Sequence, residues 1–304
     1  MKSKFKILGI LMAVVLLVTA CGNGAETTDE TEAAGETTAT EQQDDNASSM
    51  SGPISVISRE EGSGTRGAFV ELVGVEDADG NDATSVEAVI QNNTEAVMTT
   101  VAGEDNAIGY ISLGSLNDTV NALKVDDVEA TAENVADGSY KIARPFNIVT
   151  DGEPEGAEAD LIGFILSEEG QKIVEEEGYV KSPDAKEYTP EESVTGSITI
   201  AGSSSVTPVM EKLVEAYNKI NPDVKIQVNM SDSTTGVQSV KDGIAQIGMA
   251  SRELKESEQD LNKVVIAMDG IAVIVNKDSS VDNISMDSLK SIYLGEMENW
   301  EDVK

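Results

Sequence analysis

Residues 197–217 read SITIAGSSSVTPVMEKLVEAY and join a β-branched run, a turn of small hydroxyl residues and an apolar-periodic segment. The alternating residues of 197–201 predict a strand. From 206 to 217 the apolar positions recur at three- and four-residue spacing, which predicts a helix that ends before Asn221-Pro222. A strand, a short turn and a helix in this order are the building unit of α/β proteins, so this stretch predicts an α/β fold.

The same unit recurs twice in the chain. A second strand at 225–230 precedes the turn 231–237, and a third strand at 54–58 precedes the turn 59–65. Short β-branched runs that alternate with helical segments are typical of mostly parallel sheets. We expect strands at these positions and at 107–112, 146–150, 197–201 and 264–276.

Three further features complete the predicted organisation. The last strand is long and is expected to break at Gly270, and a second helix is expected from about 159 to 174. Residues 182–195 contain two prolines and no apolar period. We therefore expect them to form a linker or a long surface connection that divides the chain into two blocks.

The three turns share a chemistry that suits an anion. Each places hydroxyl and small residues before a helix, where backbone N–H groups and the positive end of the helix dipole point outward. Arg59 lies at a strand end, where α/β ligand sites form, and a guanidinium can grip two oxygens. Helix capping alone also explains each turn, and a surface ion pair with Glu60 or Glu61 also explains Arg59. Residues 62–65 lack the Lys-Ser/Thr of a P-loop, which disfavours nucleotide hydrolysis.

Composition excludes several classes of function. The 304 residues include no histidine and one cysteine, which excludes Ser-His-Asp and Cys-His catalysis, histidine-ligated zinc and an intramolecular disulfide. Lys and Arg number 21 against 56 Asp and Glu, and the formal charge of −35 argues against nucleic acid as a partner. We expect no metal and no cofactor. An anionic ligand must be held by local donors against the charge of the whole chain.

The N-terminus is typical of a secreted lipoprotein. Residues 1–20 combine a basic end with a short apolar run, as in signal peptides. Leu17-Val18-Thr19-Ala20-Cys21 resembles the lipobox of bacterial lipoproteins, which implies lipidation of Cys21; an ordinary signal peptide with an incidental thiol is the alternative. Residues 21–51 contain eight acids and no Lys or Arg. Beyond Cys21 we therefore expect a disordered acidic tether, and the folded part starts near Gly52.

Eight longer segments carry a family resemblance. They are AGSSSVTP (201–208), DSTTGVQSVKDG (232–243), IGMASREL (247–254), GEMENWEDV (295–303), VISREEGSGTRGAF (56–69), NAIGYISLG (106–114), ARPFNIVT (143–150) and FILSEEGQKIVEEEGYV (164–180). Together they resemble the phosphate-binding proteins of bacterial phosphate ABC transporters, the PstS family. The resemblance covers nearly all of residues 53–181 and 196–304 and implies a two-lobed, periplasmic-binding-protein-like (type II) α/β fold.

The order of the segments differs from that of the family. In the family, SITIAGSSSVTP opens the mature domain, NWEDV leads into PISVISREEGSGTR, and EGQKIVEEEGYV closes it. Here the second half comes first, and the continuation of 300–304 is what begins at 52–54. The resemblance thus implies a circular permutation in which 182–195 joins the usual ends. A rearranged or misassembled gene is the alternative.

Mapped onto this order, the family architecture implies two lobes. One lobe is expected at 52–140 plus 272–304 and carries the Arg59 turn. The other is expected at 141–271 and carries the SSSV and STTG turns. The run around Gly270 and the region near Arg144 are expected to cross between the lobes and to form a hinge.

The resemblance also implies a set of phosphate ligands. They are hydroxyl residues of the three turns, one glycine and one arginine: Ser204, Ser205, Ser233, Arg59, Ser63, Gly64 and Thr65. Glu61 occupies the acidic position beside the arginine, where a carboxylate would orient the guanidinium. Ser251 stands where well-known members have an aspartate that accepts the proton of hydrogen phosphate. We include Ser251 among the expected ligands, and its hydroxyl makes the rejection of fully ionised sulfate less secure.

The resemblance implies an extracytoplasmic lipoprotein that captures inorganic phosphate between two lobes and delivers it to an ABC permease, without enzymatic chemistry. We expect a monomer anchored through Cys21 to the cell membrane of a Gram-positive-type bacterium. Three alternatives stay open. They are a binding protein for sulfate or a metal oxyanion, a non-transporting surface interaction protein, and a serine hydrolase that uses Ser63 or Ser204. The hydrolase is disfavoured because neither a histidine nor a Ser-x-x-Lys motif is available to either serine.

Overall fold

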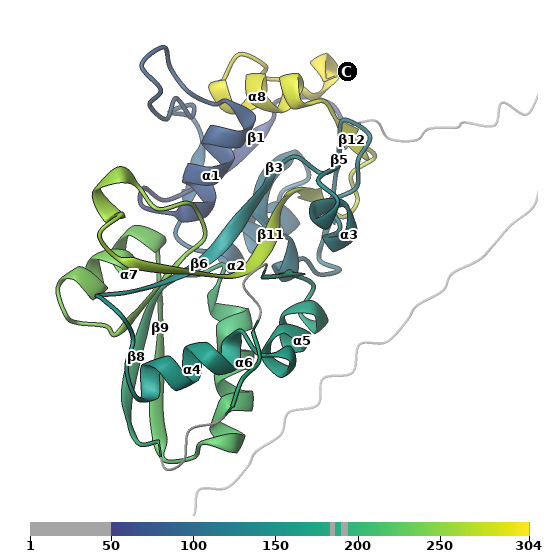
Figure 1. Cartoon of the computed structure of the whole chain (residues 1–304). Helices are drawn as coiled ribbons and strands as arrows, with labels where there is room; N and C mark the ends of the chain where they lie inside the picture. The colour runs from purple at the N-terminus through teal and green to yellow at the C-terminus, as the bar shows by residue number, and fades with distance from the viewer. Residues whose placement is uncertain (1–49, 183–185, 190–193, 304) are drawn as a thin grey trace, which may run out of the picture. The chain divides into compact units, whose positions relative to one another are not determined.

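A computed structural model describes residues 50–182, 186–189 and 194–303 (Figure 1). They belong to one compact unit, Asn46–Lys304. The predicted signal peptide, the predicted lipidation site Cys21 and the predicted acidic tether up to residue 49 lie outside the described residues. Within the described part, no helix has both the length and the apolar character needed to cross a membrane.

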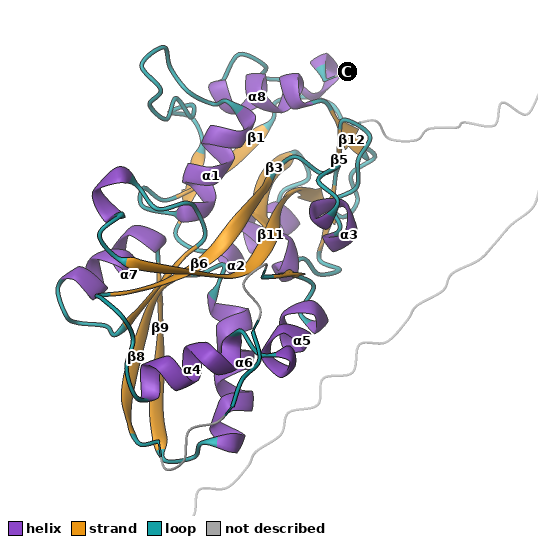
Figure 2. Ribbon diagram, in the orientation of Figure 1, coloured by secondary structure: helices purple, strands orange, loops and turns teal. Residues whose placement is uncertain are grey.

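The described residues alternate between strands and helices, as Figure 2 shows. The strands are β1 (Ser55–Arg59), β2 (Val89–Gln91), β3 (Ala107–Ser112), β4 (Val120–Ala122), β5 (Lys124–Val125), β6 (Ala143–Thr150), β7 (Val180–Lys181), β8 (Gly196–Ser203), β9 (Val224–Ser231), β10 (Ile247–Ala250), β11 (Asn262–Asn276) and β12 (Asn283–Ile284). The helices are α1 (Gly64–Val73), α2 (Thr94–Gly103), α3 (Ala132–Ala136), α4 (Ala157–Ile165), α5 (Glu168–Glu176), α6 (Thr207–Ile220), α7 (Ser233–Lys241) and α8 (Met286–Leu294). The α/β prediction is confirmed.

The main sheet is mixed rather than mostly parallel. Its strands follow the order β2-β1-β3-β11-β6-β10-β8-β9. On one flank β1 is parallel to β2 and β3, and on the other β8 is parallel to β9 and β10. In the middle, β11 is antiparallel to both β3 and β6, and β6 is antiparallel to β10. Two parallel α/β flanks are therefore joined through a pair of antiparallel strands.

Strand β11 belongs to both flanks. Residues up to Gly270 pair with β6, and residues from Ile271 onward pair with β3. The predicted break at Gly270 is wrong, because the strand continues through it and shifts register between Val265 and Ala267 instead. Gly270 has a packing role, since a Cβ there would lie 3.0 Å from a methyl group of Val135.

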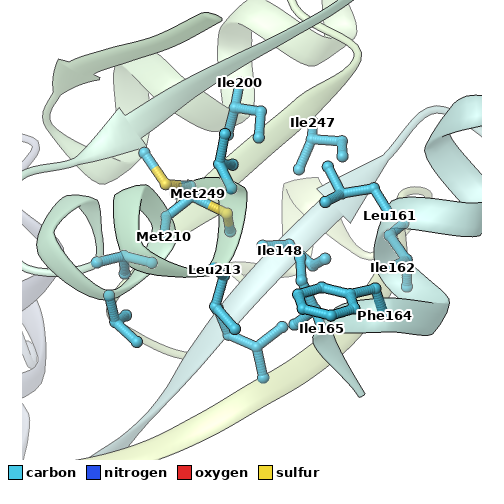
Figure 3. Packing of buried hydrophobic residues seen from close by; sticks show 14 of the residues in the cluster. Ile148, Leu161, Ile162, Phe164, Ile165, Ile200, Met210, Leu213, Ile247 and Met249 are labelled. Carbon is cyan, nitrogen blue, oxygen red and sulfur yellow. The ribbon is translucent and has the colours of Figure 1, made fainter. Parts of the chain in front are cut away.

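Two large groups of buried apolar side chains flank the central strands. One group is formed by β6, β8, β10 and helices α4 to α6, and Figure 3 shows it around Met249, Leu213 and Phe164. The other is formed by α1, β3, α8 and the second half of β11, and it includes the sole tryptophan, Trp300. The first group draws on residues between 146 and 267, and the second on residues before 143 and after 270.

The helix expected over 159–174 is two helices. α4 ends at Ile165, and Ser167 caps α5 by accepting a hydrogen bond from the backbone N–H of Gly170 at 2.9 Å. A Cβ at Gly170 would collide with the carbonyl oxygen of Ile165. Both helices bury apolar residues at helical spacing, so the apolar period continues across the break between them. Periodicity alone therefore predicts one helix.

Segments from the two ends of the described chain lie together. The backbone N–H of Ile54 donates to Glu298 O at 2.8 Å, and that of Trp300 donates to Gly52 O at 3.0 Å. The connection 182–195 is packed where it is described, since the Tyr188 hydroxyl lies 3.2 Å from the carboxylate oxygens of Asp160 on α4. It is a surface connection rather than a free linker over these residues.

Candidate functional site

Arg59 ends β1 and is buried, with 2% of its side chain exposed. Glu60 accepts hydrogen bonds from Nε and Nη2 of Arg59, both at 2.7 Å. The prediction that Glu61 orients the guanidinium is therefore wrong, because Glu60 folds back onto it whereas Glu61 is exposed. Nη2 of Arg59 also donates to Ser204 Oγ at 3.1 Å. Nη1 is buried without a hydrogen-bond partner among the described residues, which is a costly state for a cationic nitrogen unless an anion meets it.

The predicted Arg59 turn runs directly into a helix. Ser63 is the N-cap of α1 and accepts from Arg66 N at 3.3 Å, so its hydroxyl performs the capping role. Thr65, in the first turn, lies with its Oγ1 2.8 Å from Ser205 Oγ. A Cβ at Gly64 would collide with the hydroxyl oxygen of Ser233. Glycine at this position thus allows α1 to approach α7.

The SSSV turn brings three buried serines between β8 and α6. Ser203 Oγ donates to Ser251 Oγ at 3.0 Å, and Ser204 and Ser205 contact Arg59 and Thr65 as described above. Their exposed fractions are at most 5%. Buried hydroxyls require hydrogen-bond partners, and these serines find theirs in distant parts of the chain.

The STTG turn is the start of α7 rather than a loop. Asp232 is the N-cap, and Ser233 is fully buried in the first turn. Ser251 follows β10, and its backbone N–H donates to Ser233 Oγ at 3.1 Å. Thr234 Oγ1 donates to the carbonyl of Gly62 at 3.1 Å, which joins this turn directly to the Arg59 turn.

The sequence-predicted residues therefore come together, apart from Glu61. We call the linked, buried hydroxyls the hydroxyl network; its members are Thr65, Thr94, Ser203, Ser204, Ser205, Ser233 and Ser251. It joins α1 and α2 to the SSSV turn, α7 and the end of β10.

Two further residues contact the network although the sequence does not predict them as ligands. Thr94 opens α2 with its Oγ1 3.3 Å from both Ser204 Oγ and Ser205 Oγ. Arg144, near the start of β6, is 2% exposed, and its Nη2 donates to Thr65 Oγ1 at 3.1 Å. Asn93-Thr94 before a helix was a detectable capping signal, but nothing local to Arg144 distinguished it from a hinge residue.

The electrostatics at the network favour an anion. The N-termini of α1, α2, α6 and α7 all begin at or next to its hydroxyls, so four helix dipoles contribute positive potential there. Burial lowers the pKa of Arg144, Asp269 opposes that shift, and the nearby Arg59 adds to it. The effect of Arg59 on Arg144 indicates that the two positive charges lie in one region.

The hydroxyl of Tyr110 hydrogen-bonds to the end of β1 beside Arg59. Its hydroxyl accepts from Arg59 N at 3.3 Å and pairs with Ser58 Oγ at 2.9 Å. Burial raises the pKa of Tyr110 to about 12, so the phenol stays neutral and adds no negative charge to the site at physiological pH.

One cavity, of about 460 Å³, borders the network and is lined by residues that include Thr94 and Ser204. A second cavity, of about 370 Å³, has no residue of the network in its lining, which includes Ser63, Arg66, Arg252 and Lys255. Among the described residues, no cluster of Cys, Asp and Glu suits a metal ion.

The described contacts of Ser204 and Ser63 place both hydroxyls in hydrogen bonds within the candidate site. Ser204 contacts only a guanidinium and hydroxyls among the described side chains, and Ser63 caps a helix. Neither serine has an amine or carboxylate partner in these contacts to accept its proton. Hydroxyls can both donate and accept, so the network can instead exchange its internal hydrogen bonds for bonds to anion oxygens.

Comparisons with known proteins show which proteins this chain is similar to. A family model described as "PBP superfamily domain" matches residues 10–169 and 188–304. The phosphate-binding protein PstS 2 of Streptococcus agalactiae is 50% identical over 266 residues, which cover 85% of this chain and 90% of the relative. The phosphate-binding protein PstS of Bacillus subtilis is 36% identical over 130 residues, 41% of this chain and 43% of the relative.

A solved structure is also similar. It is a phosphate-binding protein of a phosphate ABC transporter from Streptococcus pneumoniae, with a TM-score of 0.67 and 45% identity. The match covers 83% of this chain and 100% of that one.

Proposed function

Because the chain belongs to the PstS family of phosphate-binding proteins, within the PBP superfamily, we propose that it captures inorganic phosphate at the hydroxyl network. The relatives are substrate-binding proteins of transporters rather than enzymes. The proposed ligands are Arg59, Gly64, Thr65, Ser204, Ser205, Ser233 and Ser251, with Ser63 holding the start of α1.

The observation that carries this proposal is the buried Arg59 among hydroxyls from both flanks of the sheet. Dehydrating a divalent anion is expensive, and a shell of donors with a buried guanidinium can replace the lost water. Thr65 and Ser205 are 140 positions apart in the sequence, yet their oxygens lie 2.8 Å apart. An ion held between them contacts both flanks, so binding favours a closed arrangement of two lobes about the crossing strands β6 and β11.

Calorimetric titration of the full chain with inorganic phosphate tests the function. We expect saturable 1:1 binding in the micromolar range or tighter, which corresponds to about −8 kcal/mol or a more negative value. Absence of heat and of any thermal stabilisation by millimolar phosphate would contradict the proposal.

We also propose that the chain is a circular permutant of the commoner family order, with lobes at 52–140 plus 272–304 and at 141–271. The contacts of Ile54 and Trp300 support this, because they bring 52–54 against 298–301, where the family chain is continuous. The S. agalactiae relative is matched over most of both chains, whereas the B. subtilis relative is matched over less than half of both. An alignment follows chain order. When two relatives carry the same halves in opposite order, it can therefore match only one half at a time.

Delivery to a membrane-embedded ABC permease and anchoring through Cys21 complete the proposal. The lipobox-like Leu17–Cys21 supports an extracytoplasmic lipoprotein, in which two acyl chains suffice for stable anchoring. Expression of the Cys21→Ser variant in a Gram-positive host tests the anchor. We expect the variant in the medium and the unchanged chain in the membrane fraction, and equal membrane association of both would contradict it.

Ser251 favours one second candidate, a binding protein for another oxyanion such as sulfate. A hydroxyl in place of a carboxylate leaves no obligate proton acceptor at this position. Competition of sulfate against phosphate in the same titration distinguishes the two candidates.

A further inference from the structure

Arg144 has a buried guanidinium that is only partly used. Its Nη2 lies 3.1 Å from Asp269 Oδ2 and donates to Thr65 Oγ1 at 3.1 Å. Its Nε and Nη1 are buried without a hydrogen-bond partner among the described residues, in the same state as Nη1 of Arg59. Two guanidiniums with unused donors thus border one hydroxyl network.

We propose that Arg144 is a second cationic ligand of the bound ion, so that this site takes the doubly charged form of a tetrahedral oxyanion. This inference rests on the proposed function. Arg144 reaches the network through Thr65, which is itself a proposed ligand. Strand register fixes the position of Arg144, because Arg144 on β6 lies opposite Asp269 on the antiparallel neighbour β11.

The second charge complements the hydroxyl of Ser251. A carboxylate at that position would require a proton from the ligand and would repel a dianion, whereas Ser251 contacts hydroxyls of Ser203 and Ser233 and can donate. A hydroxyl at position 251 removes a negative charge from the site, and the buried guanidinium of Arg144 adds a positive one. Both features favour a ligand with two negative charges and no proton.

The charged and titratable groups around Arg144 are consistent with this role. Asp269 faces it from β11, Arg59 from β1, Tyr110 from β3 and Tyr179 from the segment before β7. Burial raises the pKa of both tyrosines, so they stay neutral, and Asp269 offsets one of the two positive charges. The ring of Phe146 covers the guanidinium, with its centroid 5.4 Å from the Arg144 Cζ atom.

Titrations of phosphate and sulfate at pH values below and above the second pKa of phosphate test the inference. For the unchanged chain we expect phosphate affinity to rise with pH, and sulfate, which is dianionic throughout, to compete. Arg144→Gln is expected to weaken both ions by about 30-fold or more at high pH, because a buried charge partner is lost. Ser251→Asp is expected to abolish sulfate binding while phosphate binding persists at lower pH.

Arg252→Gln is the matched control, because Arg252 is also buried but is paired with Glu258 outside the network. Its phosphate affinity is expected to change less than about threefold. If Arg144→Gln does not fold, Asp269→Asn carries the test, since it removes the neutralising partner and keeps Arg144. We then expect equal or tighter anion binding, whereas a purely structural pair predicts weaker binding.

The outcomes separate the two proposals. A chain that binds neither ion contradicts the proposed function itself. A chain that binds phosphate with unchanged affinity after Arg144→Gln, or with weakened affinity after Asp269→Asn, contradicts the role of Arg144 alone.

Discussion

Arg252 and Arg144 are both buried beside carboxylates, but their pairs differ in completeness. Arg252 donates to both oxygens of Glu258, at 2.7 and 2.8 Å, and to the carbonyl of Glu253 at 2.9 Å. Arg144 has a single 3.1 Å contact with Asp269 and leaves two nitrogens unused. A saturated pair has no capacity left for a ligand, whereas an unsaturated one beside hydroxyls does.

The comparison extends to Arg59, which combines both features. Glu60 fixes the guanidinium through two bonds at 2.7 Å, yet Nη1 remains available. Orientation by a carboxylate on one edge and unused donors on the other edge preorganise Arg59 for its proposed role as an anion ligand. The four predictions below concern Arg59, Arg252, Asp269 and Thr94 in turn.

Replacing Arg59 by Ala is expected to have the largest effect on binding. Loss of the buried cation leaves the anion unpaired and is expected to cost about 3–5 kcal/mol, or roughly two to four orders of magnitude in Kd. Calorimetry with phosphate measures it. Lys219→Ala is the control, because Lys219 pairs with Glu215 on the exposed face of α6, and we expect less than a tenfold change. Equal losses of phosphate affinity in the two variants would contradict a specific role of Arg59 in binding.

Arg252→Gln is expected to weaken folding rather than binding. Glu258 would remain buried without its cation, which is expected to lower the free energy of unfolding by about 3 kcal/mol. Urea unfolding followed by the fluorescence of Trp300 measures this loss. An unchanged unfolding midpoint would show that the saturated pair contributes nothing to stability.

Asp269 gives a pH-dependent test of the unsaturated pair. Burial raises its pKa from 3.8 to about 6, while Arg144 opposes the shift. Between these values the folded chain holds a proton that the unfolded chain has lost, so this stabilisation is complete below about pH 4 and disappears as pH rises through about 6. We expect the unfolding free energy of the unchanged chain, relative to Asp269→Asn, to fall across this window. If the unfolding free energies of the two chains changed with pH in parallel, the raised pKa of Asp269 would be contradicted.

Thr94→Val is expected to have the smallest effect. The variant removes one hydroxyl from the network and is expected to weaken phosphate binding by about 0.5–1.5 kcal/mol, or roughly threefold to tenfold. Thr100→Val is the control on the same helix, because Thr100 bonds to Ala96 O and Gln91 rather than to the network. A larger loss in the control would remove Thr94 from the site.

Most of the site was predictable because its signals are local. Hydroxyl and glycine residues between a strand and a helix produce similar N-terminal geometry, and helices do begin at or near Thr65, Ser204 and Ser233. The strands β3 and β9 were found for a similar reason, since β-branched runs act over a few residues.

Two predictions fail because residue type alone does not determine local geometry and packing. Glycine weakens isolated strands and therefore predicts a break at Gly270, but β11 continues through it, and a Cβ there would lie 3.0 Å from a methyl group of Val135. The resemblance predicts that Glu61 orients Arg59, whereas the turn brings the adjacent Glu60 onto the guanidinium.

The sequence by itself determined the α/β units, the three anion-suited turns and the exclusion of histidine chemistry, because these depend on residue type and short spacing. Only the tertiary structure decided that Thr94 and Arg144 contact the other residues of the candidate site. Strand register places Arg144 opposite Asp269, and packing brings Thr65 to Ser205 across 140 positions. Such contacts depend on how distant segments bury one another, and no local pattern encodes that.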